Sequence, residues 1–304
     1  MIWPGQSIPP QVTMPIRDLF LALGVVTLWG LNFVAIKWGV DEVSPYLLTA
    51  LRYIGCALPA IFFVRRPAVS WGMLIAYGMT VGVLQFSFLF SAIGLGMPAG
   101  LASLVMQMQV FFTLGLAALF LGERPTPLRL VGAAIALIGL CTIGAEHIGG
   151  AVLVPLLMTL LAAFFWSVSN IITKRAGPVD MFAFVIWASL VPPLPMLALS
   201  LLLEGPGPLL ELPFISGQAI FSVLFIAYGS TLLGYGGWAV LLGRHPSGLV
   251  APFALLVPIV GFAAAFVFLG EAVSSLELVG SLLIFLGLML NVFGPRLIAR
   301  WRPA

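Results

Sequence analysis

Apolar residues form long runs along the chain, and short polar segments separate these runs. A helix needs about 20 predominantly apolar residues to cross a bilayer core about 30 Å thick. We expect ten membrane-crossing helices, at residues 18–37, 45–64, 71–93, 97–120, 128–145, 150–172, 180–203, 214–241, 249–269 and 276–294. Proline, glycine and charged residues occupy the breaks, as in Gly122-Glu123-Arg124-Pro125. A β-barrel is rejected, because its strands would alternate apolar and polar residues in segments of about ten.

Composition supports a membrane protein. Of the 304 residues, 62% are hydrophobic and only 8% are charged, whereas soluble domains carry about 25% charged residues. The predicted fold class is therefore an all-α membrane protein. Cys56 and Cys141 both lie in apolar runs, so a disulfide framework is not expected. The first sixteen residues are polar and contain four prolines, which indicates a cytoplasmic tail and not a signal peptide.

The basic residues predict the orientation in the membrane, because cytoplasmic loops are enriched in Lys and Arg. With the N-terminus inside, only Lys37 lies in an outer loop, and Arg52 lies within the second run. The other eleven of the 13 basic residues lie at cytoplasmic ends: Arg17, Arg65, Arg66, Arg124, Arg129, Lys174, Arg175, Arg244, Arg296, Arg300 and Arg302. We therefore predict that both termini are cytoplasmic.

The chain contains an internal repeat. Leu121-Gly122-Glu123 matches Leu269-Gly270-Glu271 at an offset of 148 residues, and Trp29 matches Trp166 at an offset of 137. The pattern indicates two copies of a five-helix unit, and because five is odd, the copies must have opposite orientations. Inverted repeats are typical of transporters whose substrate site lies at the interface of the repeats.

The predicted division of the chain follows from this repeat. Residues 1–16 form a cytoplasmic tail, residues 17–146 the first five-helix unit, residues 147–295 the second, inverted unit, and residues 296–304 a basic cytoplasmic tail. The fifth and tenth helices begin at matching capping signals. Thr126 precedes Pro127, and Ser274 with Glu277 forms a capping box.

Several short motifs resemble those of a known family. Trp29-Gly30-Leu31-Asn32-Phe33, Leu51-Arg52-Tyr53 and the Gly-Glu pairs 122–123 and 270–271 are similar to motifs of the drug/metabolite transporter superfamily, in its EamA branch. The resemblance implies a ten-helix exporter of small metabolites, often amino acids, in the bacterial inner membrane. It also implies a central cavity lined by helices 1–4 and 6–9, with helices 5 and 10 as a scaffold. The second copy reads Trp166-Ser167-Val168-Ser169-Asn170, so its asparagine lies one residue later and strict two-fold equivalence is not expected.

Polar and aromatic side chains at membrane depth are candidate site residues, because burying them is costly. Arg52 is suited to a substrate carboxylate; the alternative is an arginine that reaches the outer interface near Asp41 or Glu42. Asn32 and Asn170 could bind a substrate or only join helices. The candidate substrate-binding residues are Trp29, Asn32, Arg52, Gln107, Trp166, Asn170, Tyr228 and Tyr235.

Gln107 and Gln109 are about 200° apart on an α-helix, so we expect only one of them, Gln107, to face the cavity. A cavity walled by the Trp and Tyr side chains would suit an apolar or aromatic substrate; the alternative is that these rings only pack between helices. Carriers of nucleotide sugars or sugar phosphates would need several basic residues at depth to bind phosphate, and Arg52 is alone there.

The acidic residues all lie in loops or at helix ends, so we expect transport that does not require a proton gradient. An enzyme is not expected, because His147 and His245 lie on opposite sides of the membrane and no nucleophile–base or metal constellation is visible. We therefore expect no catalytic residue, cofactor or metal. The preferred function is amino-acid export, with another small metabolite or drug, a membrane enzyme or a pore as alternatives. The oligomeric state stays open, a monomer included.

Overall fold

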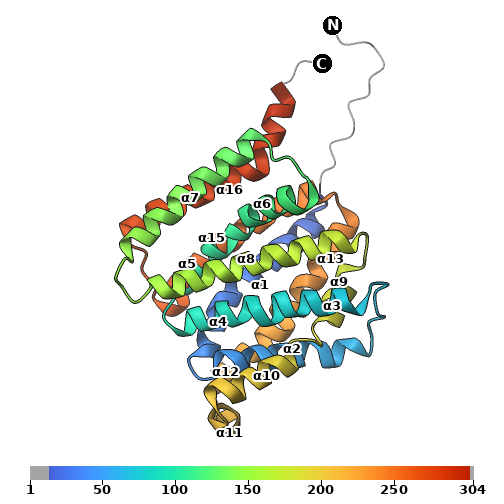
Figure 1. Ribbon diagram of the computed structural model, residues 1–304, viewed down its shortest axis with the longest axis vertical. Coiled ribbons are helices and arrows are strands. Elements are labelled where there is room, and N and C mark those ends of the chain that lie inside the picture. The colour runs from blue at the N-terminus through green and yellow to red at the C-terminus, as the bar shows by residue number, and fades with distance from the viewer. Residues whose placement is uncertain (1–13, 302–304) are drawn as a thin grey trace.

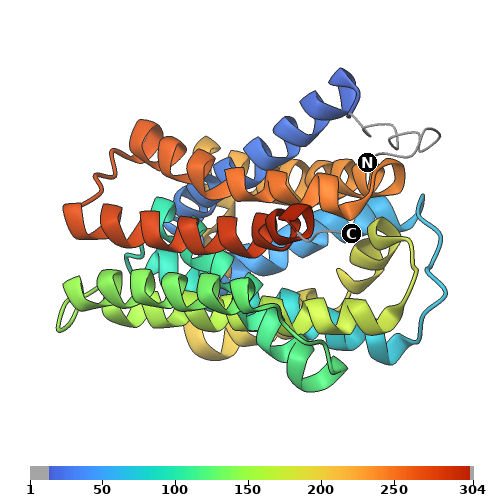
Figure 2. The same ribbon diagram turned by 90° about the horizontal axis from the view of Figure 1, so that it is seen from above.

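The computed structural model describes residues 14–301, without the side chains of Ser247 and of residues 295–301. Most of the first predicted tail, residues 1–13, and the last three residues of the second lie outside this part. Within the described residues the fold is entirely helical and contains no strand. The helices run roughly side by side, and α1 begins at the same end of the bundle as α16 ends (Figures 1 and 2).

Short loops connect the helical segments. Those of the first half are α1 (Ile16–Val40), α2 (Pro45–Ile61), α3 (Trp71–Tyr77), η1 (Gly78–Gln85), α4 (Phe86–Gly94), α5 (Ala99–Val105), η2 (Met106–Met108), α6 (Gln109–Leu121) and α7 (Pro127–Glu146). Those of the second half are α8 (Leu153–Ala176), α9 (Met181–Ala188), α10 (Pro193–Leu199), η3 (Ser200–Glu204), α11 (Gly207–Glu211), η4 (Leu212–Phe214), α12 (Gly217–Leu224), η5 (Phe225–Tyr235), α13 (Gly236–Arg244), α14 (Ser247–Val250), η6 (Ala251–Leu255), α15 (Leu256–Leu269) and α16 (Ser275–Trp301).

Consecutive segments join into long apolar helices. Among the described residues, nine are long and apolar enough to cross a membrane. The second predicted run forms a shorter apolar helix of 17 residues, because it ends at Ile61 and not at residue 64. The last helix continues past the predicted end at residue 294, through Trp301. The chain is thus a multi-pass membrane protein.

Capping residues explain several of the helix boundaries. In the predicted capping box, Ser274 N–H donates to Glu277 Oε2 at 2.9 Å, and Glu277 N–H donates to Ser274 Oγ at 3.1 Å. At α7 the helix begins at Pro127 as predicted, but the Thr126 side chain makes no capping bond. Gly270 ends α15 with φ of 66°, a left-handed conformation that favours glycine, and the repeat-related glycine ends α6 in the same way.

Irregular turns interrupt the long helices near mid-bundle. The segments η1 and η5 are π-helical, whereas η2 and η6 are 3₁₀-helical. The four segments lie at corresponding places in the two halves of the chain. Such turns often occur at functional sites, since they alter the angles at which neighbouring side chains leave the helix axis.

Helices α7 and α16 lie side by side along one side of the bundle (Figures 1 and 2). Glycines bring their backbones together in a reciprocal pattern: Gly132 faces the carbonyl of Gly287, and Gly139 faces the carbonyl of Gly280. Residues 132 and 139 correspond to 280 and 287 at the repeat offset. Gly132 therefore faces the residue that corresponds to Gly139 in the second half, and Gly139 faces the residue that corresponds to Gly132.

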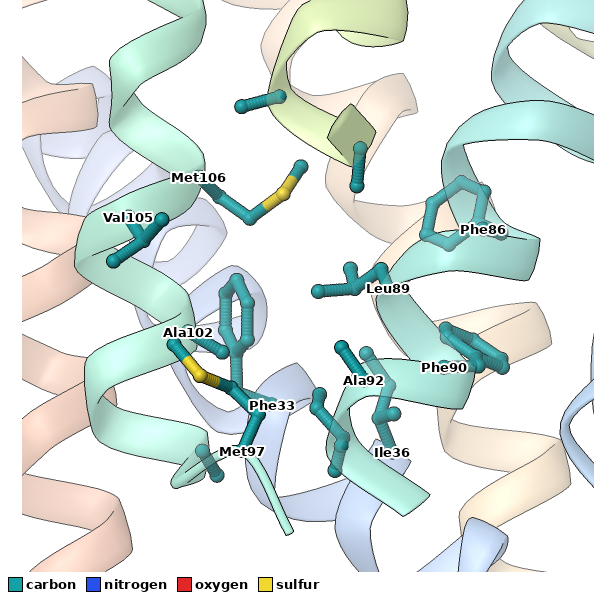
Figure 3. Packing of buried hydrophobic residues seen from close by; sticks show 14 of the residues in the cluster. Phe33, Ile36, Phe86, Leu89, Phe90, Ala92, Met97, Ala102, Val105 and Met106 are labelled. Atoms are coloured by element: carbon teal, nitrogen blue, oxygen red, sulfur yellow. The ribbon is translucent and has the colours of Figure 1, made fainter. Parts of the chain in front are cut away.

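The remaining long helices pack around the interior. α1 contacts α15, α12 and η5, while α8 contacts α6, α4 and η1. α2 packs on α10. Buried apolar side chains fill one half of this interior, where Phe33 and Ile36 of α1 pack with side chains from α4 and α5 (Figure 3).

Candidate functional site

A cavity of about 330 Å³ lies among the long helices. Its walls come from both halves of the chain: α1, α2, α3, α4, α5, α6 and their irregular turns, and α8, α9, α13, α15, η5 and η6. The volume is in the lower part of the range of small-molecule sites. The cavity therefore offers room for one small ligand, enclosed by side chains from both halves.

The cavity is asymmetric along the bundle axis. Its wall reaches Thr173, Met181 and Leu242, near the ends of α8 and α13 and the start of α9. This is the end where α1 begins, because Arg244 of α13 donates to Asp18 in the first turn of α1 at 2.8 Å. The cavity thus extends toward the end of the bundle where the described chain starts.

The opposite end is closed by apolar packing. Phe33, Leu89 and Met106 line the cavity floor. Behind them, Ala92 and Ala102 and their neighbours pack into the buried cluster that Figure 3 shows between α1, α4 and α5. No continuous passage can run through side chains packed this closely.

Carboxylates tie the two halves together at this closed end. The Glu271 carboxylate accepts hydrogen bonds from Ala99 N–H at 2.7 Å and from Gly100 N–H at 3.0 Å, which joins the end of α15 to the start of α5. Ser44 donates to Glu204 at 2.5 Å. These bonds supplement the apolar closure with polar contacts between the first and second halves of the chain.

Glu42 makes a further bond of this kind. Both the backbone N–H and the hydroxyl of Ser216 donate to its carboxylate, at 2.8 and 2.5 Å. The two bonds stabilise the charged form and hold the pKa of Glu42 below its ordinary value. Asp41 pairs with Lys37 instead. Neither acid pairs with Arg52, so the alternative interpretation, an interfacial arginine next to Asp41 or Glu42, does not describe this side chain.

Seven of the eight residues predicted for the site line the cavity. They are Trp29, Asn32, Arg52, Gln107, Trp166, Asn170 and Tyr235. The eighth, Tyr228, is not part of the lining and is 39% exposed on the outside of the bundle.

The aromatic wall is centred on Trp29. Its indole N–H donates to the carbonyl of Ser230 at 3.1 Å, and its ring lies 5.5 Å from Tyr235 and 5.1 Å from Trp238. Gly234 lies directly behind the indole, where a Cβ atom would be 2.5 Å from Trp29 Nε1. The site therefore positions Trp29 through one hydrogen bond, two ring contacts and a glycine without a side chain.

The two asparagines differ in their bonding. Asn170 donates to Gln109 at 2.8 Å and to Thr113 at 3.0 Å, so it joins α8 to α6 as well as lining the cavity. Asn32 is 7% exposed, and its side-chain oxygen is buried without a hydrogen-bond partner among the described residues. The cavity thus contains one amide, of Asn170, that is already hydrogen-bonded, and one, of Asn32, whose oxygen can still accept a hydrogen bond.

The expectation that only one of Gln107 and Gln109 faces the cavity was wrong. Gln107 donates to the carbonyl of Ala254 at 3.0 Å, and both it and Gln109 line the cavity. The 3₁₀ turn at Met106–Met108 explains the difference. It has three residues per turn instead of 3.6, which brings alternate side chains closer in angle.

Arg52 is buried at the cavity wall and is 2% exposed. Its Nε donates to the Thr231 hydroxyl at 3.2 Å, and its guanidinium carbon lies 3.9 Å from the centre of the Phe86 ring. Its Nη1 has no hydrogen-bond partner among the described residues. No Asp or Glu of the described chain lines the cavity, so this guanidinium is the only charged group in its wall.

The cavity contains no constellation for metal binding, since within residues 14–301 no group of three or more His, Cys, Asp or Glu side chains is placed to hold a metal ion.

Similarity to a known protein family covers nearly the whole chain. The model of the EamA-like transporter family matches residues 17–145 and again residues 153–293. The chain belongs to the EamA-like transporter family. It is a membrane transporter, and the family predicted from the sequence motifs is confirmed.

Relatives of this transporter carry descriptive names. It is 46% identical to a "Probable amino-acid metabolite efflux pump" of Salmonella typhimurium, over 92% of this chain and 96% of the relative. The protein of the same name from Escherichia coli is 43% identical, over 95% and 97%. A "Probable terminal-alkyne amino-acid exporter" of Streptantibioticus cattleyicolor is 29% identical, over 89% and 91%.

The fold of this transporter also occurs in a solved structure. A crystal structure matches with a TM-score of 0.63 and 20% identity, over 95% of this chain and 98% of that chain. At this identity the likeness concerns the fold alone.

Several wall residues of this transporter were not among the predicted site residues. They include Trp238, Tyr77, Phe86 and Ser103. Trp238 had a usable signal, since it lies within the predicted helix at residues 214–241 and carries the same polar N–H on an apolar ring as the tryptophans that were chosen. Phe86 and Ser103 had none, because nothing in an apolar run distinguishes a cavity-facing phenylalanine or serine from a packed one.

Proposed function

We propose that this protein is a secondary transporter of the bacterial inner membrane that exports small amino-acid metabolites by alternating access at the central cavity. The observation that supports this most directly is the cavity itself. It is enclosed by both halves of the chain, extends toward one end of the bundle and is closed at the other. A carrier needs a site that is accessible from one side at a time, and a closed end opposite an accessible one meets that requirement.

The proposed topology has ten membrane-crossing helices with both termini in the cytoplasm. The 17 residues of α2 are at the short end of the range for a spanning helix. The first five helices, within residues 17–146, and the last five, within 147–295, are related by a two-fold axis in the membrane plane. The reciprocal glycine contacts of α7 and α16 support this relation, because a two-fold axis turns each contact into the other.

In this topology the cavity faces the cytoplasm. The substrate enters at the end formed by α8, α9 and α13 and binds among Trp29, Asn32 and the other candidate residues lining the cavity. Export then requires the apolar packing of Figure 3 to open while the cytoplasmic end closes. Because the two halves are inverted copies, each half can adopt the arrangement that the other has now. This exchange gives the second state, in which the cavity opens to the opposite side.

The proposed substrates are amino acids and their small derivatives, apolar and aromatic ones included. The names of the relatives from Salmonella typhimurium and Escherichia coli point to amino-acid metabolites. The lining fits such molecules, since aromatic rings surround a few polar side chains. Transport proceeds without proton coupling, because among the described residues no carboxylate lines the cavity to take up a proton at depth.

Transport by the purified protein in proteoliposomes tests this function. A panel of labelled amino acids and their derivatives is presented to the vesicles with and without a pH gradient. We expect saturable flux of a subset of the panel, with an initial downhill rate that is unchanged when the pH gradient is collapsed. Absence of flux for every compound would refute amino-acid export. Uphill accumulation driven by a pH gradient alone would refute the uncoupled mechanism.

A further inference from the structure

The environment of Arg52 has a feature that helix packing does not explain. Buried charges in proteins are normally paired, because an isolated charge at low dielectric is unfavourable. Arg52 is 2% exposed, yet no ion pair to it occurs among residues 14–301. The rings of Phe86 and Tyr53, at 3.9 and 5.4 Å from its guanidinium carbon, compensate part of the lost hydration. The donor Nη1 remains without a partner.

A second, much smaller cavity adjoins Arg52. It measures about 10 Å³, about the space of one water molecule. Arg52, Tyr77, Val185 and Tyr235 line this cavity and the large one, so the two spaces meet at these residues. The remaining polar side chains of the small cavity carry hydroxyls. Those of Ser189 and Thr231 already donate to the carbonyls of Val185 and Ile226, at 2.7 and 2.9 Å. The available donors are Arg52 Nη1 and the tyrosine hydroxyls of this wall, which make no hydrogen bond among the described residues, and this arrangement is complementary to an anionic oxygen.

The other end of a zwitterionic ligand would meet a different environment. Two buried amide oxygens in the wall of the large cavity, those of Asn32 and Gln85, lack a partner among the described residues, and both are neutral acceptors. A substrate ammonium group therefore finds hydrogen-bond acceptors and aromatic faces but no opposite charge. The carboxylate meets an opposite charge, whereas the ammonium group meets only neutral acceptors, so the two ends of an amino acid are recognised unequally.

We propose that Arg52 and the surrounding hydroxyls form a carboxylate subsite, and that this transporter selects small apolar monocarboxylates whether or not they bear a free ammonium group. The proposal rests on the proposed function and defines the substrate class of that same cavity. N-acylated amino acids and 2-hydroxy acids then belong to the transported class. Amino-acid amides and esters, which lack the anionic oxygens, are excluded.

Competition in proteoliposomes tests the subsite. The labelled substrate is the amino acid that the transport panel shows to be carried fastest, and the unlabelled competitors are its N-acetyl derivative, its 2-hydroxy analogue and its amide. We expect the first two to compete within several-fold of the parent amino acid, and the amide to compete at least about tenfold more weakly. An amide that competes as well as the parent, or an N-acetyl derivative and a 2-hydroxy analogue that both fail to compete, would overturn the proposal. Either result leaves amino-acid export itself intact.

Substitution of Arg52 supplies the second arm. In Arg52→Gln the ratio between the apparent affinities for the amino acid and for its amide should fall to near one. This ratio does not depend on how much protein folds. Arg129→Gln is the matched control, because Arg129 also has a buried, unpartnered Nε but lies outside the cavity wall, in α7. An unchanged ratio in Arg52→Gln would contradict the subsite. If that variant does not fold, the wild-type competition series still decides.

Discussion

Replacing Gly139 with alanine tests the close contact between α7 and α16. A Cβ atom at this position would lie 2.5 Å from the carbonyl oxygen of Gly280, 2.8 Å from Leu283 Cβ and 2.9 Å from Ile284 N. Two of these three atoms belong to the backbone of α16, so no side-chain rotation can relieve the overlap. The helices must separate, which loses dispersion contacts along their whole length.

The expected cost follows from the general penalty for overpacking, about 1–3 kcal/mol. Alanine also has a higher helix propensity than glycine, by about 1 kcal/mol, which acts in the opposite direction. Gly115→Ala isolates that second effect, because Gly115 lies inside α6 and a Cβ atom there would meet nothing within 4 Å. The difference in unfolding free energy between the two alanine variants should therefore be about 1–3 kcal/mol.

Thermal unfolding of the purified variants in detergent measures this difference. We expect Gly139→Ala to unfold several degrees below Gly115→Ala, and Gly115→Ala to unfold at or above the temperature of the wild type. Equal stability of the two variants would refute the close contact of α7 with α16. It would also remove the reciprocal glycine pairing as support for the two-fold arrangement of the halves.

Two further pairs of variants test the wall of the cavity. Gly234→Ala should displace the Trp29 indole and slow transport several-fold, because its Cβ atom would lie 2.5 Å from Trp29 Nε1. Gly243→Ala is the control and should leave the initial transport rate unchanged, because a Cβ atom there would meet nothing within 4 Å. Equal transport rates of the two variants would show that the position of the indole does not matter. Asn170→Ala should lower stability by about 1–3 kcal/mol, because it leaves the bonded groups of α6 unpaired, whereas Asn32→Ala should weaken substrate affinity at nearly unchanged stability. Thermal unfolding and concentration-dependent flux measure both asparagine variants, and the reverse pattern would contradict the roles assigned to the two amides.

Run length and capping chemistry were sufficient to locate the helices. Hydrophobic runs of about 20 residues have few alternatives to membrane-spanning helices, because unpaired backbone groups are too costly in lipid. The capping box at Ser274 and Glu277 predicted the start of α16 to within a residue. The end of α2 was less predictable. Phe62 and Phe63 continue the apolar run, but they lie beyond the helix and are 81% and 88% exposed.

Side-chain direction was harder to predict, because it depends on the local turn type. Tyr228 and Tyr235 were both expected at the site because of their depth in the membrane, and on a regular α-helix residues seven apart would share a face. The π-helical turns from Phe225 to Tyr235 have more residues per turn, and Tyr228 consequently points outward while Tyr235 lines the cavity. The 3₁₀ turn after Val105 similarly moved Gln109 into the wall. Sequence periodicity cannot indicate such turns.

Counterflow most directly tests the claim that this protein is an alternating-access carrier. Proteoliposomes are loaded with a high concentration of an unlabelled substrate and diluted into a trace of the same compound in labelled form. A carrier whose cavity faces one side at a time should accumulate the label transiently above equilibrium, because each outward passage of unlabelled substrate returns the site for an inward one. Alternating access predicts this overshoot, and predicts its loss when the vesicles are loaded with buffer alone. Rapid equilibration of the label with no overshoot and no saturation would instead indicate a pore and would contradict alternating access.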